Sequence, residues 1–382
     1  MSQELKARAI VSRAELDKGG WKLEDVALRQ PGKGELLVEM VGSGVCHTDV
    51  LVGGLPGEGS PIGFYPRVLG HEGSGYVKAV GPDVTVAKVG DPVLLSFDFC
   101  KACTMCNGGH YSHCDDFMKV NFGPWPVFTT DDKHEKPEIS GRFFGMSSFA
   151  SLSIVNETSV VNAKDLVKDK NELALFSPLG CGIQTGSGSV INAAKATADD
   201  TVCVLGLGGV GLSALMGAKV QGCKKVIGVD RVESRLQLAR ELGAMHVIDG
   251  SKLGDKSLAD AIKEAADGEG PTVTIETTGA PPLIKAAIEA SRNKGKVIQV
   301  GSAPFDFNLD INVFSFMARG IQYIGAIEGH AYPAEYVPKM VQWYREGKFP
   351  LDKFTKLFPA DQFEEAIHEM HDGSTIKPIL LW

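Results

Sequence analysis

Residues 201–230 read TVCVLGLGGVGLSALMGAKVQGCKKVIGVD, and this stretch decides the fold. A short apolar run is followed by a glycine-rich turn, a helical segment and a second apolar run that ends in Asp230. The glycines of the turn are Gly206, Gly208, Gly209 and Gly211. A bare GxGxxG pattern is weak, but here a strand precedes it, a helix follows it, and Asp230 stands 19 residues past Gly211. The stretch therefore predicts a βαβ unit that binds a dinucleotide.

Each part of this unit has a physical role toward a dinucleotide. The glycines permit a tight turn, close approach of a pyrophosphate and close packing of helix on strand. Backbone N–H groups at the start of the helix present a positive dipole end to the phosphates. Asp230 is expected to bind the adenosine ribose hydroxyls and to repel a 2′-phosphate, which favours NAD over NADP, although Arg231 beside it can pair with that phosphate. The alternative is a glycine-rich turn without a nucleotide.

The same alternation of strand and helix continues to about residue 300. Apolar strands alternate with helical patterns at the spacing of βαβ units, which predicts a doubly wound parallel sheet with right-handed crossovers. The strands read TVCVL, KKVIGVD, MHVI, PTVTIET and GKVIQVG, and the helices are predicted at about 209–221, 232–242, 257–267 and 281–292.

The regions before and after this alternating region have different patterns of apolar residues. Residues 35–80 are short apolar runs separated by glycine, which predicts antiparallel strands in a small barrel-like β domain. Residues 115–148 are predicted to be a loop, and two amphipathic helices after about residue 327 are predicted to return to the first domain. The predicted domains are therefore 1–184 and 185–325, with 326–382 completing the first.

Composition excludes several classes of function. The 382 residues carry a net charge of −8, so no basic surface for nucleic acid is expected. Apolar runs are too short to cross a membrane, and the first residues lack the apolar segment of a signal peptide, so the expected location is the cytoplasm.

Four of the eight cysteines stand close together as CKACTMCNGGHYSHC. In a long cytosolic chain this crowding favours a metal over disulfides. Cys100, Cys103, Cys106 and Cys114 can close a tetrahedral, structural zinc site in a lobe spanning 98–116. An iron–sulfur cluster, or His110 or His113 in place of a cysteine, are the alternatives.

A second set of metal-binding residue types lies far apart in the chain. Cys46, His71 and Cys181 would leave one position of a zinc ion open for chemistry. Spacing alone does not establish this set, because single cysteines and histidines usually pack in a core. Packing is the interpretation for Cys203 and Cys223.

Several stretches together resemble the zinc-dependent alcohol dehydrogenases of the medium-chain dehydrogenase/reductase family. They are CHTD at 46–49, GHEGSG at 70–75, the four-cysteine lobe, LGCGIQTG at 179–186, GLGGVG with Asp230, and STIKPIL at 374–380. The run LGCGIQTG is most similar to the aryl-alcohol (benzyl alcohol) dehydrogenase branch. The resemblance implies a GroES-like β-barrel catalytic domain, a Rossmann domain, two zinc ions per chain, NAD, and a homodimer or homotetramer.

The resemblance also implies roles beside the metal. The catalytic zinc ligands would be Cys46, His71 and Cys181. Asp49 would orient His71, Glu72 would assist ligand exchange, and Thr48 would bind the alcohol and begin a proton relay. Many members carry a histidine at the position of Leu51, which passes the proton to solvent. Leucine cannot do so, so the proton would leave through His47 or water.

Further residues match positions that contact the cofactor. His47 and Lys377 match contacts to the pyrophosphate, and Arg235 matches a basic residue near the ribose. Thr185, Val210 and Val300 match positions that pack on the nicotinamide end.

The expected activity is oxidation of primary, aromatic or allylic alcohols to aldehydes and the reverse, by hydride transfer from a zinc-bound alkoxide to NAD. An aldehyde reductase for a larger biosynthetic substrate is one alternative, and a non-catalytic redox sensor or scaffold is another. The candidate pocket residues are Phe97, Phe99, Phe122, Trp125 and Phe143, which could equally pack their loop. A β-like run within 314–329 is expected to form an edge strand that pairs with a second copy.

Overall fold

The computed structural model describes residues 5–130 and 138–382 and divides into two compact units. Unit 1 comprises Met1–Cys181, Tyr332–Tyr344 and Pro350–Trp382, and unit 2 comprises Gly182–Ala331 and Arg345–Phe349. The first crossing between the units therefore follows Cys181, and the chain returns after Ala331. The sequence-based boundaries stand after residues 184 and 325.

Unit 1 contains a closed barrel with the strand order β1-β2-β7-β8-β4. These strands are β1 (Leu5–Ser12), β2 (Trp21–Leu28), β4 (Arg67–Val68), β7 (Trp125–Thr130) and β8 (Ile139–Gly141). The predicted barrel-like domain is thus confirmed. The segment predicted as a loop is only partly one, because it contributes β7, β8 and helix α3 (Phe117–Phe122), and its residues 131–137 lie outside the described part of the chain.

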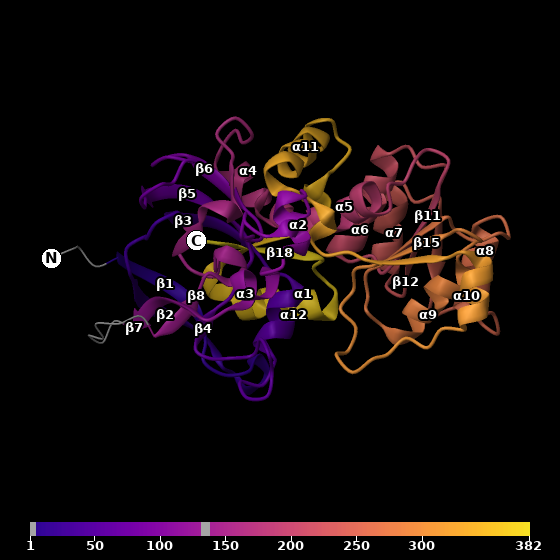
Figure 1. Cartoon of the computed structure of the whole chain (residues 1–382), viewed down its shortest axis with the longest axis horizontal. Helices are drawn as coiled ribbons and strands as arrows, with labels where there is room; N and C mark the ends of the chain where they lie inside the picture. The colour runs from indigo at the N-terminus through magenta and orange to yellow at the C-terminus, as the bar shows by residue number, and fades with distance from the viewer. Residues whose placement is uncertain (1–4, 131–137) are drawn as a thin grey trace. The chain divides into compact units, whose positions relative to one another are not determined.

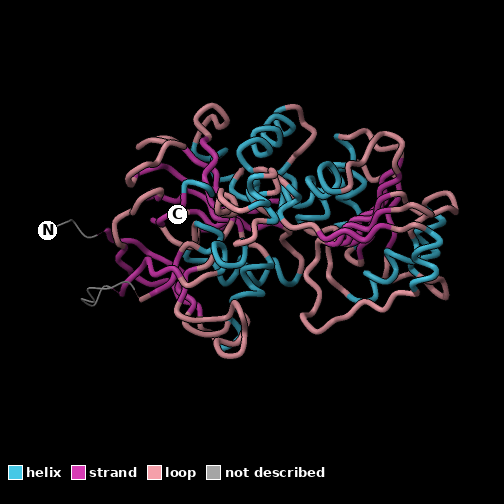
Figure 2. The backbone as a smooth tube through the Cα atoms, viewed as in Figure 1, coloured by secondary structure: helices cyan, strands magenta, loops and turns pink. Residues whose placement is uncertain are grey.

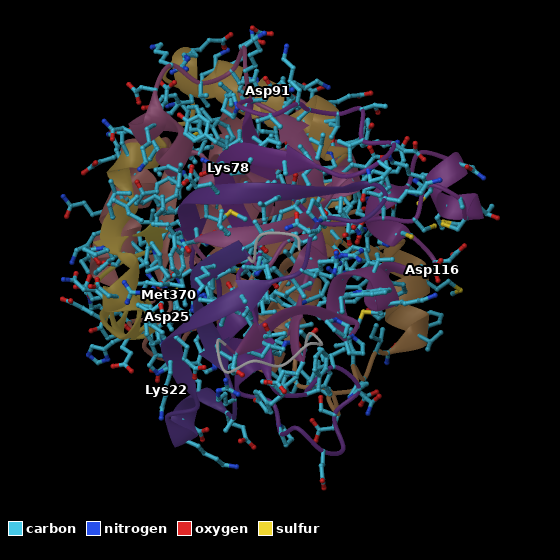
Figure 3. All side chains as sticks on the ribbon, turned by 90° about the vertical axis from the view of Figure 1, so that its left-hand side faces the viewer. Lys22, Asp25, Lys78, Asp91, Asp116 and Met370 are labelled. Atoms are coloured by element: carbon cyan, nitrogen blue, oxygen red, sulfur yellow. The ribbon has the colours of Figure 1, made fainter. Side chains whose placement is uncertain are left out.

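A second sheet of unit 1 carries the segments that lead into the candidate site. Its order is β10-β6-β5-β3-β18-β17, and β9 also pairs with β3. The strands are β3 (Glu35–Gly44), β5 (Glu72–Val80), β6 (Pro92–Leu95), β9 (Leu152–Asn156), β10 (Val160–Asn162), β17 (Thr355–Pro359) and β18 (Lys377–Leu381). In Figure 3, Lys78 of β5 and Asp91 beside β6 lie above Lys22 and Asp25 of β2.

Strand β3 is the centre of this second sheet. Its register with β5 shifts between Leu37 and Val38 and again between Met40 and Gly42, which bends the strand. Gly42 is required there, because a Cβ would stand 2.9 Å from the Ala174 Cα. The bent strand ends at Gly44, two residues before the candidate ligand Cys46.

Short helices cover unit 1. They are α1 (His47–Gly53), α2 (Thr104–Asn107), α3, α4 (Lys170–Leu175), α11 (Pro333–Arg345) and α12 (Phe363–Asp372). Helix α4 begins where it does because Asp169 accepts a hydrogen bond from the Glu172 N–H at 2.9 Å. Helices α11 and α12 correspond to the two amphipathic helices predicted near the C-terminus. Within residues 5–130 and 138–382, no helix has both the length and the apolar character needed to span a bilayer.

Unit 2 is built on a parallel sheet with the strand order β13-β12-β11-β14-β15-β16. Its strands are β11 (Thr201–Leu205), β12 (Lys225–Asp230), β13 (His246–Asp249), β14 (Val273–Glu276), β15 (Lys296–Gln299) and β16 (Gln322–Gly325), which Figure 2 shows in magenta. The strand order reverses between β11 and β14, where doubly wound sheets place ligands. The predicted fold class is confirmed.

Helices cover both faces of this sheet (Figure 1). They are α5 (Gly182–Gly188), α6 (Gly209–Val220), α7 (Glu233–Leu242), α8 (Leu258–Ala265), α9 (Pro281–Ala290) and α10 (Val313–Arg319). Helices α6 and α7 lie on one face, and α8 and α9 lie on the other, where Ile262 and Ala287 pack against Cys203 of β11. Cys203 is therefore a core residue, as predicted, and burial raises the pKa of its thiol.

Candidate active site

Three segments of unit 1 bring Cys46, His71 and Cys181 together. Cys46 caps α1, His71 immediately precedes β5, and Cys181 follows a short turn of 3-10 helix, Ser177–Gly180. One ligand atom from each residue lies within 4.8 Å of the others. His71 and Cys181 are buried, and Cys46 is partly exposed. The structure therefore assembles the three residues that the sequence left 25 and 110 positions apart.

The carboxylate of Asp49 orders this group. Its Oδ1 lies 2.8 Å from His71 Nδ1 and accepts the Gly70 N–H at 3.0 Å, while its Oδ2 accepts the Cys46 N–H at 3.1 Å. Asp49 is fully buried, so these contacts are shielded from water. One side chain thus fixes the backbone of one candidate ligand and the ring of another.

The donor set fits a zinc ion with an open position. His71 Nε2 is buried without a hydrogen-bond partner among the described residues, which is costly unless something binds there. Two thiols and one imidazole are the donors of known catalytic zinc sites. A hydrogen bond from Cys181, followed by the charges of His71 and Lys377, holds the pKa of Cys46 well below its usual range. The thiolate that results is the form that binds metals.

A buried ion pair lies beside the ligands. Lys377 Nζ stands 2.9 and 3.0 Å from the two carboxylate oxygens of Glu72 and donates to the Val45 carbonyl at 3.2 Å. Burial raises the pKa of Glu72 to about 7. Burial alone would lower the pKa of Lys377, but the Glu72 carboxylate raises it above its ordinary value. Lys377, which the family resemblance assigned to the pyrophosphate, is thus 4% exposed and bonded inside unit 1.

The other predicted catalytic residues occupy the first turn of α1. His47 is exposed and Thr48 is partly buried, so both can be reached from solvent while Asp49 faces the interior. Leu51 lies one turn further along the same helix and is also exposed. The proton relay implied by the resemblance would therefore begin on α1.

The four-cysteine lobe forms a second candidate metal site. Ligand sulfurs of Cys100, Cys103, Cys106 and Cys114 lie within 4.8 Å of one another, without His110 or His113 in the group. The cysteines form no disulfide. Backbone N–H groups of Cys106 and Asp115 donate to Cys103 Sγ at 3.4 Å each, and they lower the pKa of that thiol to about 7. Such N–H···S contacts favour the thiolates that a metal requires.

The glycine-rich turn of unit 2 has the geometry expected of a phosphate-binding loop. Gly206 has φ 87°, which favours glycine, and a Cβ on Gly211 would stand 1.8 Å from the Gly206 carbonyl oxygen. Gly208, at the start of α6, has open space where a Cβ would be. Backbone can therefore approach a phosphate closely at this helix N-terminus.

Asp230 lies at the carboxyl end of β12, beside this turn. Its Oδ2 accepts the Leu207 N–H at 2.7 Å, and its Oδ1 accepts the N–H groups of Arg231 and Val232 at 2.7 and 3.0 Å. Arg235 Nη1 stands 3.9 Å from Asp230 Oδ2, and the Arg235 Nε is buried without a partner among the described residues. The predicted ribose-binding acid and basic residue are therefore neighbours.

The remaining cofactor candidates also belong to unit 2. Thr185 lies in α5 and is buried, and Val210 lies in the first turn of α6. Val300 follows β15, where its N–H donates to the Glu276 carbonyl at 2.9 Å. Val210 and Val300 thus stand at the carboxyl ends of β11 and β15, the edge at which doubly wound sheets bind ligands.

The predicted aromatic pocket residues divide into two groups. Phe97, Phe99 and Phe143 are buried, so the packing interpretation suits them, whereas Phe122 and Trp125 are partly exposed. The sequence analysis missed Phe144, whose ring stacks on His71. The doublet of aromatic residues at 143–144 was the only available signal, and it does not reveal which ring faces a ligand.

Comparison with known proteins agrees with this arrangement. The model of the alcohol dehydrogenase GroES-like domain matches residues 32–165, and that of the zinc-binding dehydrogenase domain matches residues 209–346. A geraniol dehydrogenase from Castellaniella defragrans is 38% identical over 367 residues, or 95% of each chain. Together the matches to the two domain models cover most of unit 1 and unit 2.

Two crystal structures are similar over nearly the whole chain. A benzyl alcohol dehydrogenase from Acinetobacter calcoaceticus is 37% identical with a TM-score of 0.88, covering 98% of this chain and 99% of that one. An alcohol dehydrogenase zinc-binding domain protein from Burkholderia ambifaria is 35% identical with a TM-score of 0.91, covering 99% of both chains. The chain therefore belongs to the zinc-dependent alcohol dehydrogenases of the medium-chain dehydrogenase/reductase family and is an oxidoreductase.

Proposed function

We propose that this protein oxidises primary alcohols carrying an aromatic or allylic group to the corresponding aldehydes, with NAD as hydride acceptor, and catalyses the reverse reaction. The observation that carries the proposal is the set Cys46, His71 and Cys181, whose ligand atoms lie within 4.8 Å of one another and in which His71 Nε2 is buried without a hydrogen-bond partner among the described residues. Relatives named for geraniol, an allylic alcohol, and benzyl alcohol support the substrate class.

Cys46, His71 and Cys181 would hold the catalytic zinc. When bound, zinc supplies a Lewis acid that lowers the pKa of an alcohol and polarises an aldehyde. Asp49 keeps His71 in the orientation that leaves Nε2 free. Glu72 sits next in sequence to His71, where its pairing with Lys377 stabilises a buried negative charge near the ligands.

The first turn of α1 carries the residues that would transfer the proton of the substrate hydroxyl. The Thr48 hydroxyl can accept the proton of the substrate hydroxyl and donate its own to water or to His47, which is exposed on the same turn. Leu51 cannot take part, so water at the surface of α1 or His47 completes the route. NAD, when bound, would supply the hydride acceptor: it would take two electrons and one proton from the alcohol carbon, and the second proton would leave through Thr48.

The turn Gly206–Gly211 would bind the pyrophosphate, and Asp230 would bind the adenosine ribose. The negative charge of Asp230 disfavours a 2′-phosphate, which supports NAD as the cofactor. Thr185, Val210 and Val300 would pack against the nicotinamide half, and Arg235 would border the ribose. The four cysteines of the lobe would hold a second, structural zinc ion that closes Cys100–Cys114.

We also infer a homo-oligomer. Strand β16 is the edge of the unit 2 sheet, and an edge strand can pair with a strand of a second copy. The preceding segment exposes Phe305, Val313, Phe314 and Met317. Several large apolar side chains exposed in one short segment are typical of an interface.

The test is the initial rate of NADH formation across benzyl, cinnamyl, geranyl and short aliphatic alcohols, with NADP as the alternative acceptor. The proposal expects the highest kcat/KM for the aromatic or allylic alcohols with NAD. The variant Cys46→Ser should abolish turnover and lower bound zinc by one ion per chain while NADH still binds. Full turnover by Cys46→Ser would refute the metal mechanism, and a preference for short aliphatic alcohols would refute the substrate class.

A further inference from the structure

Besides its hydrogen bond to Asp49, the imidazole of His71 contacts two aromatic rings. The ring of Phe144 stacks on it, with centroids 4.6 Å apart and planes at 30°. The ring of Phe143 meets it edge-on, with centroids 5.5 Å apart and planes at 89°. In the part of the chain that the structure describes, these are the aromatic rings that contact His71. Two adjacent residues thus enclose one candidate metal ligand.

The hydrogen bond to Asp49 restrains the His71 ring at one atom only. It holds Nδ1 at 2.8 Å, but one hydrogen bond tolerates some misalignment and the ring torsion of a histidine is broad, so the ring can still tilt about the bond to its Cβ, which displaces Nδ1 and Nε2 together. Turning the ring moves Nε2, the nitrogen left for a metal, away from Cys46 and Cys181. A flat side chain against the imidazole face restricts this rotation, and Phe144 is that side chain.

The backbone at Phe144 is unusual in a way that produces this contact. Arg142 has φ 58° and ψ 31°, and Phe144 has φ 53° and ψ 37°, which is the left-handed region that bulky residues rarely adopt. In an extended strand, neighbouring side chains would point to opposite faces. The left-handed residues instead bring both phenylalanine rings onto the same imidazole. Strained backbone of this kind concentrates at functional sites.

The rest of unit 1 holds Phe144 in this conformation. The Phe143 N–H donates to Ser147 Oγ at 2.9 Å, and that hydroxyl donates to the Val68 carbonyl at 2.6 Å, three residues before His71. The Phe144 carbonyl accepts the Ser159 hydroxyl at 3.2 Å. The rings of Phe117 and Phe122 pack against Phe144 from α3, at centroid distances of 6.2 and 5.0 Å.

We propose that Phe144 is a positioning residue whose ring sets the plane of His71, so that Nε2 stays directed at the metal position shared with Cys46 and Cys181. This inference rests on the proposed role of those three residues as zinc ligands. It differs from a role in substrate binding, because it predicts an effect on the metal itself before any substrate is added.

The test compares variants of the full-length protein with Co²⁺ in place of zinc at the catalytic site, where visible absorption reports ligand geometry. Phe144→Leu removes the stacked ring, and Phe144→Met does so with a flexible chain that fills the space more easily. Phe144→Tyr keeps the ring. The matched control is Phe358→Leu, which removes a buried ring of β17 in the same unit that is not among the rings packed against His71 or Phe144. Cobalt affinity is measured by chelator competition, and Tm is recorded for each.

We expect the Leu and Met variants to lose about ten- to hundredfold in cobalt affinity and to change the visible spectrum, as for other residues that orient metal ligands. Phe144→Tyr should keep the wild-type spectrum, and Phe358→Leu should lower Tm without changing the spectrum. An unchanged spectrum and affinity in both Phe144→Leu and Phe144→Met would overturn the inference, even if KM for the alcohol rises. The same spectral change in Phe358→Leu would also overturn it. Absence of cobalt binding at this site in the wild-type protein would instead refute the proposed function.

Discussion

At the scale of single residues, Asp49 connects the candidate ligands more tightly than the sequence indicates. It accepts hydrogen bonds from the segments of both Cys46 and His71, and it is fully buried. The variant Asp49→Asn preserves shape but removes the charge that holds the His71 Nδ1 proton. We expect kcat/KM and zinc affinity each to fall about ten- to hundredfold. Steady-state kinetics and metal analysis of the purified variant measure both.

The matched control for this change is Asp91→Asn. Asp91 is also a buried carboxylate of unit 1, but it accepts hydrogen bonds from Lys88 and Asn162 rather than from a ligand segment. Its variant should retain zinc and activity, whatever it does to Tm. Equal losses in the two variants would mean that Asp49 acts only through general stability.

A second prediction at the scale of single residues concerns Asp230. The variant Asp230→Asn keeps an acceptor for the Leu207 N–H but removes the negative charge that opposes a 2′-phosphate. We expect the preference for NAD over NADP, as the ratio of kcat/KM values, to fall about tenfold, equivalent to about 1.4 kcal/mol. Adding Arg231→Ala should remove any gain with NADP that arises from pairing of this arginine with the phosphate. An unchanged ratio in Asp230→Asn would contradict the assigned role of Asp230.

Particular residues show which parts of the candidate site can be predicted from a sequence. Cys46, His71 and Cys181 were found because their neighbours form recognisable motifs. The Glu72–Lys377 pair joins residues 305 positions apart through pairing of β18 with β3, which local patterns do not specify. Phe144 was missed because its role depends on a left-handed backbone, and nothing in the letters FF distinguishes that from an ordinary core pair.

At the scale of elements, the periodic pattern of apolar residues predicted most of the helices and strands of unit 2. The predicted helix 209–221 is α6, Gly209–Val220, and the predicted helix 281–292 is α9, Pro281–Ala290. Residues 115–148 were harder, because β8 is only three residues long and α3 only six, too short for a periodic pattern to emerge. These elements are stabilised by the barrel and the aromatic cluster rather than by their own sequence.

The four-cysteine lobe is an element whose order should depend on its metal. Helix α2 has four residues, so it cannot be stable without the thiolates that close around it. We expect Cys103→Ser to remove one zinc ion per chain and to lower Tm by about 5 °C or more, since a loss of a few kcal/mol shifts Tm by that amount. Metal analysis and a thermal melt measure the two effects.

The control for the lobe is Cys223→Ser, the same chemical change at a buried cysteine of unit 2 that belongs to neither metal group. It should keep both zinc ions. Because Cys46, His71 and Cys181 are separate from the lobe, Cys103→Ser should also keep the catalytic zinc. Loss of both ions from Cys103→Ser would show that the lobe supports the fold of all of unit 1 rather than its own loop.

At the scale of the whole molecule, four of the ten large apolar side chains that are exposed among the described residues lie in one short segment of unit 2, residues 305–317. Phe314 is 74% exposed and Met317 is 66% exposed on α10, next in sequence to the edge strand β16. A charged residue there would be unfavourable in an interface between copies but harmless on a surface facing water. We therefore expect the wild-type protein to be an oligomer in light scattering, and Phe314→Glu to shift it to a smaller species with little change in Tm. Met245→Glu, at a methionine of unit 2 that is 61% exposed, is the matched control and should leave the mass unchanged. A wild-type monomer, or an oligomer that Phe314→Glu does not weaken, would show that the copies do not associate through this segment.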